Sequence, residues 1–78
     1  MNERFKANGQ RLRRLRGMTP MREVIDGLGI SQSALSMYEH GNRNPSDKVK
    51  IRLAQYYGVS VESIFWPEDN TKSVIKEV

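Results

Sequence analysis

The sequence predicts an all-α fold of five short helices, and two observations lead to that prediction. Apolar residues recur at the three- and four-residue spacing of amphipathic helices, and no stretch alternates long enough to form a sheet. Glycines separate these apolar segments, and a serine or threonine precedes several of them, as expected at helix ends and helix starts. With 78 residues, the chain has room for one domain.

The first predicted helix begins near Gly9, with Asn8 as its N-cap, because asparagine is a favoured capping residue. Leu12 and Leu15 stand at i and i+3 and mark its buried side. Gly17 follows the last of its basic residues and is expected to end the helix.

The second predicted helix opens at Thr19-Pro20, since threonine suits the N-cap and proline is tolerated at the first helical position. Gly29 is expected to close this helix as a left-handed residue. Its apolar stripe comprises Val24, Ile25 and Leu28.

Three further helices are each expected to begin after a serine N-cap. Ser31 precedes a helix over 32–39 that ends before Gly41. Ser46 precedes a fourth helix that ends before Gly58. Ser60 precedes a short fifth helix whose inner face is formed by Val61, Ile64 and Phe65.

Positive charge is concentrated at the start of the chain. The whole chain carries a net charge of +4, yet residues 1–22 hold seven basic residues against one acidic residue. This uneven distribution of charge favours a polyanionic partner, with nucleic acid as the first candidate. The alternative is that the basic residues form a solvated helix face. The seven are Arg4, Lys6, Arg11, Arg13, Arg14, Arg16 and Arg22.

Several function classes are excluded by composition. The chain has no cysteine and one histidine, so disulfides, cysteine zinc sites and thiol nucleophiles are absent, and no catalytic constellation is visible. We therefore predict a protein that is not an enzyme and has no metal, cofactor or small-molecule ligand. Neither a membrane span nor a signal peptide is apparent, so the expected location is the cytoplasm, associated with the nucleoid.

The stretch from Met21 to Glu39 carries the main functional motif. Two short helices meet across Gly29-Ile30-Ser31, which is the geometry of a helix-turn-helix. The third helix has one apolar face and one small, neutral-polar face. Glutamine and serine can hydrogen-bond to base edges in the major groove, and methionine can pack on a thymine methyl. The predicted base-reading residues are Gln32, Ser33, Ser36 and Met37.

Donor-rich segments flank this helix. The loop over 41–45 is suited to phosphate contacts, and the start of the second helix can point backbone N–H groups at a phosphate. The predicted contacts to the DNA backbone are Thr19, Met21, Arg22, Asn42, Arg43 and Asn44.

These segments resemble the Cro/CI (xenobiotic-response-element) family of helix-turn-helix regulators, which have the lambda-repressor-like fold. The resemblance covers residues 9–66 and is most specific over 28–41 and at Pro45-Ser46. It implies a five-helix domain that binds double-stranded DNA, usually as a homodimer on a palindromic operator. The sequence departs from the family at Pro20-Met21, where many members carry a glutamine that contacts phosphate.

The resemblance also implies an ion pair between an arginine late in the first helix and the glutamate that ends the third, here Glu39. Aligning Leu15-Arg16-Gly17 without gaps nominates Arg16. Aligning Gly17-Met18-Thr19 as the loop nominates Arg13 instead, but needs an inserted residue before the next apolar stripe. The first alignment is favoured.

The predicted function is therefore sequence-specific DNA binding by a small transcriptional regulator, either a phage or mobile-element repressor or a Cro-like autoregulator. The alternative is a protein-interaction adapter or antitoxin-type partner module with the same fold. An adapter would expose apolar anchors on the third helix, whereas this one shows Gln32 and Ser33.

The domain organisation follows from the same pattern. Residues 1–66 are predicted to be the DNA-binding domain, with the helix-turn-helix over about 21–40. Residues 67–78 are predicted to be a tail that is either disordered or involved in dimerisation, and no second domain is expected. The apolar residues nominated for a homodimer are Phe65, Trp66, Val74, Ile75 and Val78.

Overall fold

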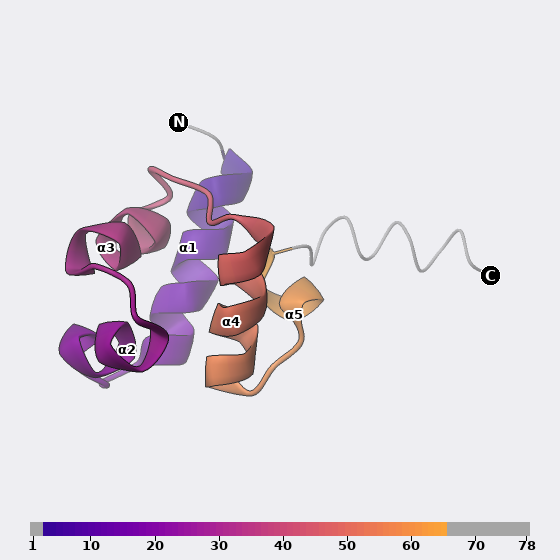
Figure 1. The fold of residues 1–78 in the computed structure, drawn as a ribbon. Coiled ribbons are helices and arrows are strands. Elements are labelled where there is room, and N and C mark those ends of the chain that lie inside the picture. The colour runs from indigo at the N-terminus through magenta and orange to yellow at the C-terminus, as the bar shows by residue number, and fades with distance from the viewer. Residues whose placement is uncertain (1–2, 66–78) are drawn as a thin grey trace.

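The structure, a computed structural model, describes residues 3–65 and forms five α-helices without strands over that range, which confirms the all-α prediction. Of the residues nominated for a homodimer, Phe65 is 2% exposed and belongs to the core, contrary to that nomination, whereas Trp66 and the proposed tail at 67–78 lie outside the described residues. The helices are α1 (Glu3–Arg16), α2 (Met21–Leu28), α3 (Gln32–His40), α4 (Asp47–Tyr57) and α5 (Val61–Phe65) (Figure 1).

The predicted caps of α3 and α4 are confirmed. Ser31 Oγ accepts a hydrogen bond from the Ala34 N–H at 3.0 Å, and Ser46 Oγ caps α4 in the same way at 3.3 Å. Gly41 ends α3 with φ 76°, a left-handed conformation that glycine adopts without a steric penalty. The third helix is one residue longer than predicted, since it includes His40.

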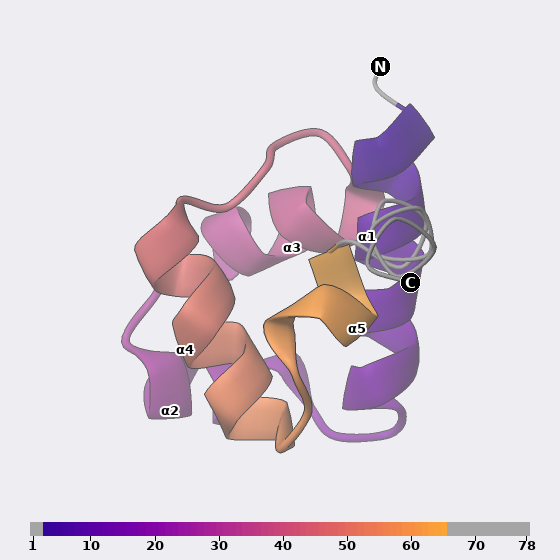
Figure 2. The same cartoon turned by 90° about the vertical axis from the view of Figure 1, so that its right-hand side faces the viewer.

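The predicted start of α1 is wrong. The helix begins at Glu3, so Asn8 and Gly9 lie inside it and both are buried. Asn8 Oδ1 accepts a hydrogen bond from Arg11 Nη2 at 2.8 Å instead of capping the helix. The reason is tertiary: α1 crosses the C-terminal end of α3 at this point, and a glycine allows the two backbones to approach closely (Figure 2).

The predicted start of α2 is also shifted. Pro20 is the N-cap, with extended φ −62° and ψ 145°, and the helix begins at Met21. Thr19 does not cap it, because no side chain makes a capping hydrogen bond there. Instead the Thr19 N–H donates to the Arg16 carbonyl at 2.9 Å, so this residue belongs to the turn that ends α1.

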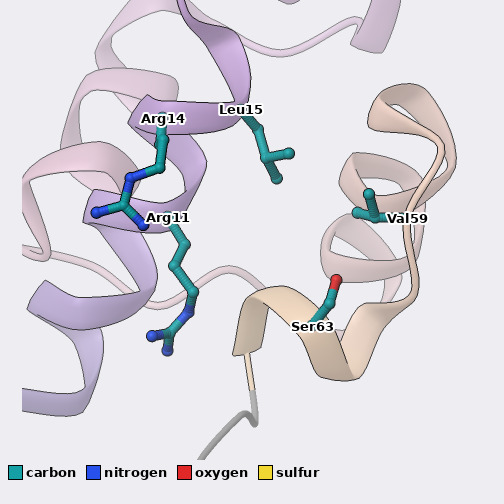
Figure 3. A pocket seen from close by; sticks show the side chains of 5 residues that line it. All are labelled: Arg11, Arg14, Leu15, Val59 and Ser63. Carbon is teal, nitrogen blue, oxygen red and sulfur yellow. The ribbon is translucent and has the colours of Figure 1, made fainter.

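The hydrophobic core is shared by all five helices, but Leu15 is not part of it. Leu15 is 38% exposed and lines an open hollow between α1 and α5, contrary to the prediction (Figure 3). Because α1 turns Leu12 into the core and Arg16 toward α3, the Leu15 side chain lies at the edge of the core, where solvent reaches it. The core residues are Leu12, Val24, Leu28, Leu35, Tyr38, Leu53, Ala54, Ile64 and Phe65.

Two cationic side chains hold α5 against the rest of the domain. Arg11 Nε donates to the Ile64 carbonyl at 2.7 Å, and Figure 3 shows Arg11 reaching from α1 toward α5. Lys50 is 8% exposed, and its ammonium nitrogen lies 5.4 Å from the centre of the Phe65 ring, within the range of a cation–π interaction. The short α5 is thereby fixed to both α1 and α4.

Candidate nucleic-acid interface

The outward face of α3 carries the four predicted base-reading residues, but they are not equally accessible. Gln32 and Ser33 are exposed in the first turn, whereas Ser36 and Met37 are partly buried. On the opposite side, Leu35 is fully buried in the core. The start of α3 is therefore its most accessible part for hydrogen bonding to a partner.

His40 closes the C-terminal end of α3. Its Nδ1 lies 2.8 Å from the Ser36 carbonyl oxygen and 3.4 Å from the Ser36 hydroxyl. With the proton on Nδ1, the ring donates to the Ser36 carbonyl. The Ser36 hydroxyl is thus near a protein group, which limits its freedom to serve as a base reader.

The loop after α3 presents polar side chains to solvent. Asn42 and Arg43 are exposed and Asn44 is partly exposed. The Asn42 N–H donates to the Met37 carbonyl at 2.9 Å, so a phosphate contact from this residue has to come from its side chain. Arg43 makes no hydrogen bond or ion pair within residues 3–65, which leaves its guanidinium available to an anion.

The start of α2 offers backbone groups more than side chains. No side chain caps this helix, and the Glu23 N–H donates to the Pro20 carbonyl at 3.1 Å, so the N–H groups of Met21 and Arg22 are the ones available to an anion. The Met21 side chain packs against the core, which restricts its predicted contact to the backbone. Arg22 is exposed and Thr19 is partly exposed beside it.

Arg16 forms a two-pronged ion pair with Glu39. Its Nε donates to Oε2 at 2.7 Å and its Nη2 donates to Oε1 at 3.1 Å, and the two side chains are 15% and 2% exposed. Arg16 Nη1 also donates to the Thr19 carbonyl at 2.9 Å. Arg13, the alternative partner, is exposed and does not make this pair. One guanidinium therefore joins α1, the end of α3 and the turn that leads into α2.

The environment of this ion pair favours the charged form of Arg16 and the neutral form of the neighbouring Tyr57. The hydrogen bonds to Glu39 raise the pKa of the Arg16 guanidinium above its usual value, against the opposing effect of burial. Burial raises the pKa of the Tyr57 phenol to about 12, and the negative charge of Glu39 adds to the shift. The Tyr57 hydroxyl is buried and has no hydrogen-bond partner among residues 3–65. A neutral phenol therefore lies near the ion pair.

Residues 3–65 contain no group of three histidine, cysteine or acidic side chains that could hold a metal ion. None of the five described helices is long and apolar enough to cross a membrane.

Comparisons with known proteins agree with the fold and the arrangement of α2 and α3. The pattern of the helix-turn-helix family matches residues 10–64, and the chain belongs to this family, in its xenobiotic-response-element branch. The lambda-repressor-like fold implied by the resemblance is thereby confirmed. No solved structure gives a significant match to the chain.

Two relatives from distant organisms are similar to this chain. An uncharacterized HTH-type transcriptional regulator of Sinorhizobium fredii, y4dJ, is 41% identical over 71 residues, which is 91% of each chain. An uncharacterized HTH-type transcriptional regulator of Methanocaldococcus jannaschii, MJ0272, is 33% identical over 48 residues, covering 62% of this chain and 73% of that protein.

Proposed function

We propose that this protein is a transcriptional regulator that binds double-stranded DNA in a sequence-specific manner. The observation that supports this most is the fixed position of α3, whose exposed first turn carries Gln32 and Ser33. The ion pair of Arg16 with Glu39 holds this helix beside the start of α2. Membership of the helix-turn-helix family and the names of both relatives point to the same function.

In the proposed complex, α3 lies in the major groove with its first turn nearest the base edges. The Gln32 amide offers a paired donor and acceptor, which matches the edge of adenine. The Arg43 guanidinium and the N–H groups at the start of α2 contact phosphates and set the register without reading sequence.

Replacing Gln32 with alanine is expected to cost about 1–3 kcal/mol on the cognate site and much less on random duplex DNA. Arg43→Ala is the matched comparison, because a phosphate contact should weaken binding to both DNAs to a similar extent. Fluorescence anisotropy with a site selected from a random duplex pool measures both effects. Equal losses on both DNAs for Gln32→Ala would contradict a base-reading role.

We propose further that the protein is a phage or mobile-element repressor or a Cro-like autoregulator, acting on a palindromic operator in the cytoplasm, at the nucleoid. The adapter or antitoxin-type alternative receives less support, since the exposed first turn of α3 carries Gln32 and Ser33 rather than apolar anchors. A footprint on DNA upstream of its own coding sequence tests the autoregulator role directly.

The working form in this proposal is a homodimer. A single recognition helix contacts only a few base pairs, and two copies about one helical turn apart double the readout. We expect the full chain to sediment as a dimer at micromolar concentration, and a version ending at Asp69 to sediment as a monomer with weaker cooperative binding to a palindrome. Two monomers with identical binding curves would exclude residues 70–78 from assembly.

A further inference from the structure

We propose that one exposed face of α1, formed by Lys6, Gln10 and Arg13, is an additional contact surface for the phosphate backbone of DNA. We call these three residues the α1 row. The inference rests on the proposed function and extends it, because it adds a third helix to the two elements that flank α3.

The α1 row is continuous because of helix geometry. Its three residues stand at i, i+4 and i+7, so they lie on one side of α1, and all three are exposed. Gly9 and Arg16 occupy the adjoining side, which packs against the C-terminal end of α3. The row therefore borders directly on the end of the proposed recognition helix.

The N-terminal end of the row touches the loop that follows α3. A Cβ built on Gly41 would lie 2.6 Å from Lys6 Cα and 2.8 Å from Lys6 N, so the two backbones are packed together. Figure 2 shows the α3–α4 connection leaving beside the N-terminal half of α1. Because Asn42 and Arg43 follow Gly41 directly, a phosphate held by this loop comes within reach of the flexible Lys6 side chain.

The other end of the row lies in a positively charged hollow. Gln10, Arg13 and Arg14 line an open hollow of about 460 Å³ together with Glu39. The Glu39 carboxylate is already paired with Arg16, so the two arginines of the wall give the hollow a net positive charge. Within residues 3–65, neither Lys6 nor Arg13 forms a hydrogen bond or an ion pair through its side chain. Unpaired cations of this kind attract phosphates and displace the counterions of DNA.

The α1 row also lies between the two segments that we propose to contact DNA phosphates, which are the loop after α3 and the start of α2. One end adjoins the loop with Asn42 and Arg43, and the other adjoins Arg16, which holds the Thr19 carbonyl at the turn into α2. Lys6 and Arg13 are separated by about 10 Å along the helix axis, enough to meet different phosphates. A merely solvated face would mix charges of both signs, whereas the only acidic residue of α1 is Glu3.

The test uses Lys6→Gln, Arg13→Gln and the double variant in the full chain, with Arg52→Gln as the matched control. Arg52 is exposed on α4 and lines a hollow against α2, away from α1. The probe is a random-sequence duplex, and anisotropy titrations at several salt concentrations give the slope of log K against log salt. Lys6→Arg and Arg13→Lys test whether charge alone is sufficient, and thermal melts check that each variant is folded.

Each single variant is expected to lower the slope by about 0.9 and to weaken binding about five- to tenfold near 0.1 M salt. The double variant should lower the slope by about 1.8, while Arg52→Gln and the charge-conserving variants keep the wild-type slope. If the single variants match Arg52→Gln while Arg43→Gln still lowers the slope, the α1 row is not a contact surface and DNA binding stands. If the wild-type chain binds no duplex at all, the proposed function fails, and the inference fails with it.

Discussion

Replacing Gly9 with alanine is expected to destabilise the domain by about 2–3 kcal/mol, even though alanine is the better helix former. The new Cβ would lie against the Glu39 carbonyl oxygen and 2.6 Å from the Tyr38 carbonyl oxygen. Both obstacles are backbone atoms of α3, so the side chain cannot be accommodated by a change of rotamer. The two helices would have to move apart where they cross.

Gly9→Ala is expected to be destabilising because the cost of overpacking exceeds the gain in helix propensity. Alanine stabilises an exposed helix interior by about 1 kcal/mol relative to glycine, but overpacking against a backbone costs more than that. Separating the helices at Gly9 also strains the Arg16–Glu39 pair, because the obstructing carbonyl belongs to Glu39 itself. For a domain of this size, we expect the melting temperature to fall by more than about 10 °C.

Gly27→Ala is the matched control, since it makes the same change inside another helix. Here the new Cβ would meet Tyr56 Cε1 at 2.7 Å, but Tyr56 is 41% exposed and its ring can rotate away. Thermal unfolding followed by circular dichroism should therefore give a melting temperature close to that of the wild type. Equal losses for both variants would contradict the close approach of α1 and α3 as the cause.

Arg16→Ala is expected to lower the free energy of unfolding by about 3 kcal/mol, against less than about 1 for an exposed pair. The substitution leaves the Glu39 carboxylate, whose side chain is 2% exposed, without a counterion. It also removes the hydrogen bond to the Thr19 carbonyl. An unpaired buried charge costs much more than the pair contributes in net terms.

Urea unfolding of Arg16→Ala, Glu39→Gln and the double variant measures this coupling, and Arg13→Ala provides the control. The double variant should be less destabilised than the sum of the two single variants, because it no longer buries a lone charge. Arg13→Ala should unfold at nearly the wild-type urea concentration, since its side chain is exposed. Wild-type stability in Arg16→Ala would show that the ion pair has no structural role.

Local rules correctly predicted the starts of α3 and α4 and the end of α3, because these three helix ends depend on local chemistry. Gly41 adopts a positive φ after α3, where a residue with a Cβ is strained. Ser31 and Ser46 accept hydrogen bonds from the first turn of the helices they precede, as short hydroxyl side chains do. The helix-turn-helix arrangement followed from these ends and from the apolar stripes between them.

The start of α1 could not be predicted from local rules because its cause lies far along the chain. Asn8 and Gly9 look like a cap and a helix start, and only the backbone of α3 explains a glycine inside the helix. Leu15 was misplaced for a related reason. Leu12 and Leu15, at i and i+3, define only a broad face of α1. Since Arg16 is turned toward Glu39 of α3, Leu12 faces the core and Leu15 faces solvent.

The helix periodicity and the resemblance both place the four predicted base-reading residues on one face of α3, but neither gives the accessibility of each residue. Gln32 and Ser33 are exposed, whereas Met37 is partly buried. The contact between Ser36 and His40 depends on rotamers at the end of α3 that no spacing rule defines. The role of each residue on DNA stays a prediction that the binding measurements test.

The triple attachment of Arg16 makes the domain preorganised for the partner that we propose. Its guanidinium fixes the end of α3 and the turn into α2 in one rigid arrangement before any DNA arrives. Docking on DNA in the proposed complex should therefore require little ordering of the protein backbone, and we expect its entropy to come mainly from released water and counterions. In the proposed complex, a domain this rigid would discriminate between DNA sites through the fit of its contacts and through the deformability of the DNA, because its own helices would not adjust.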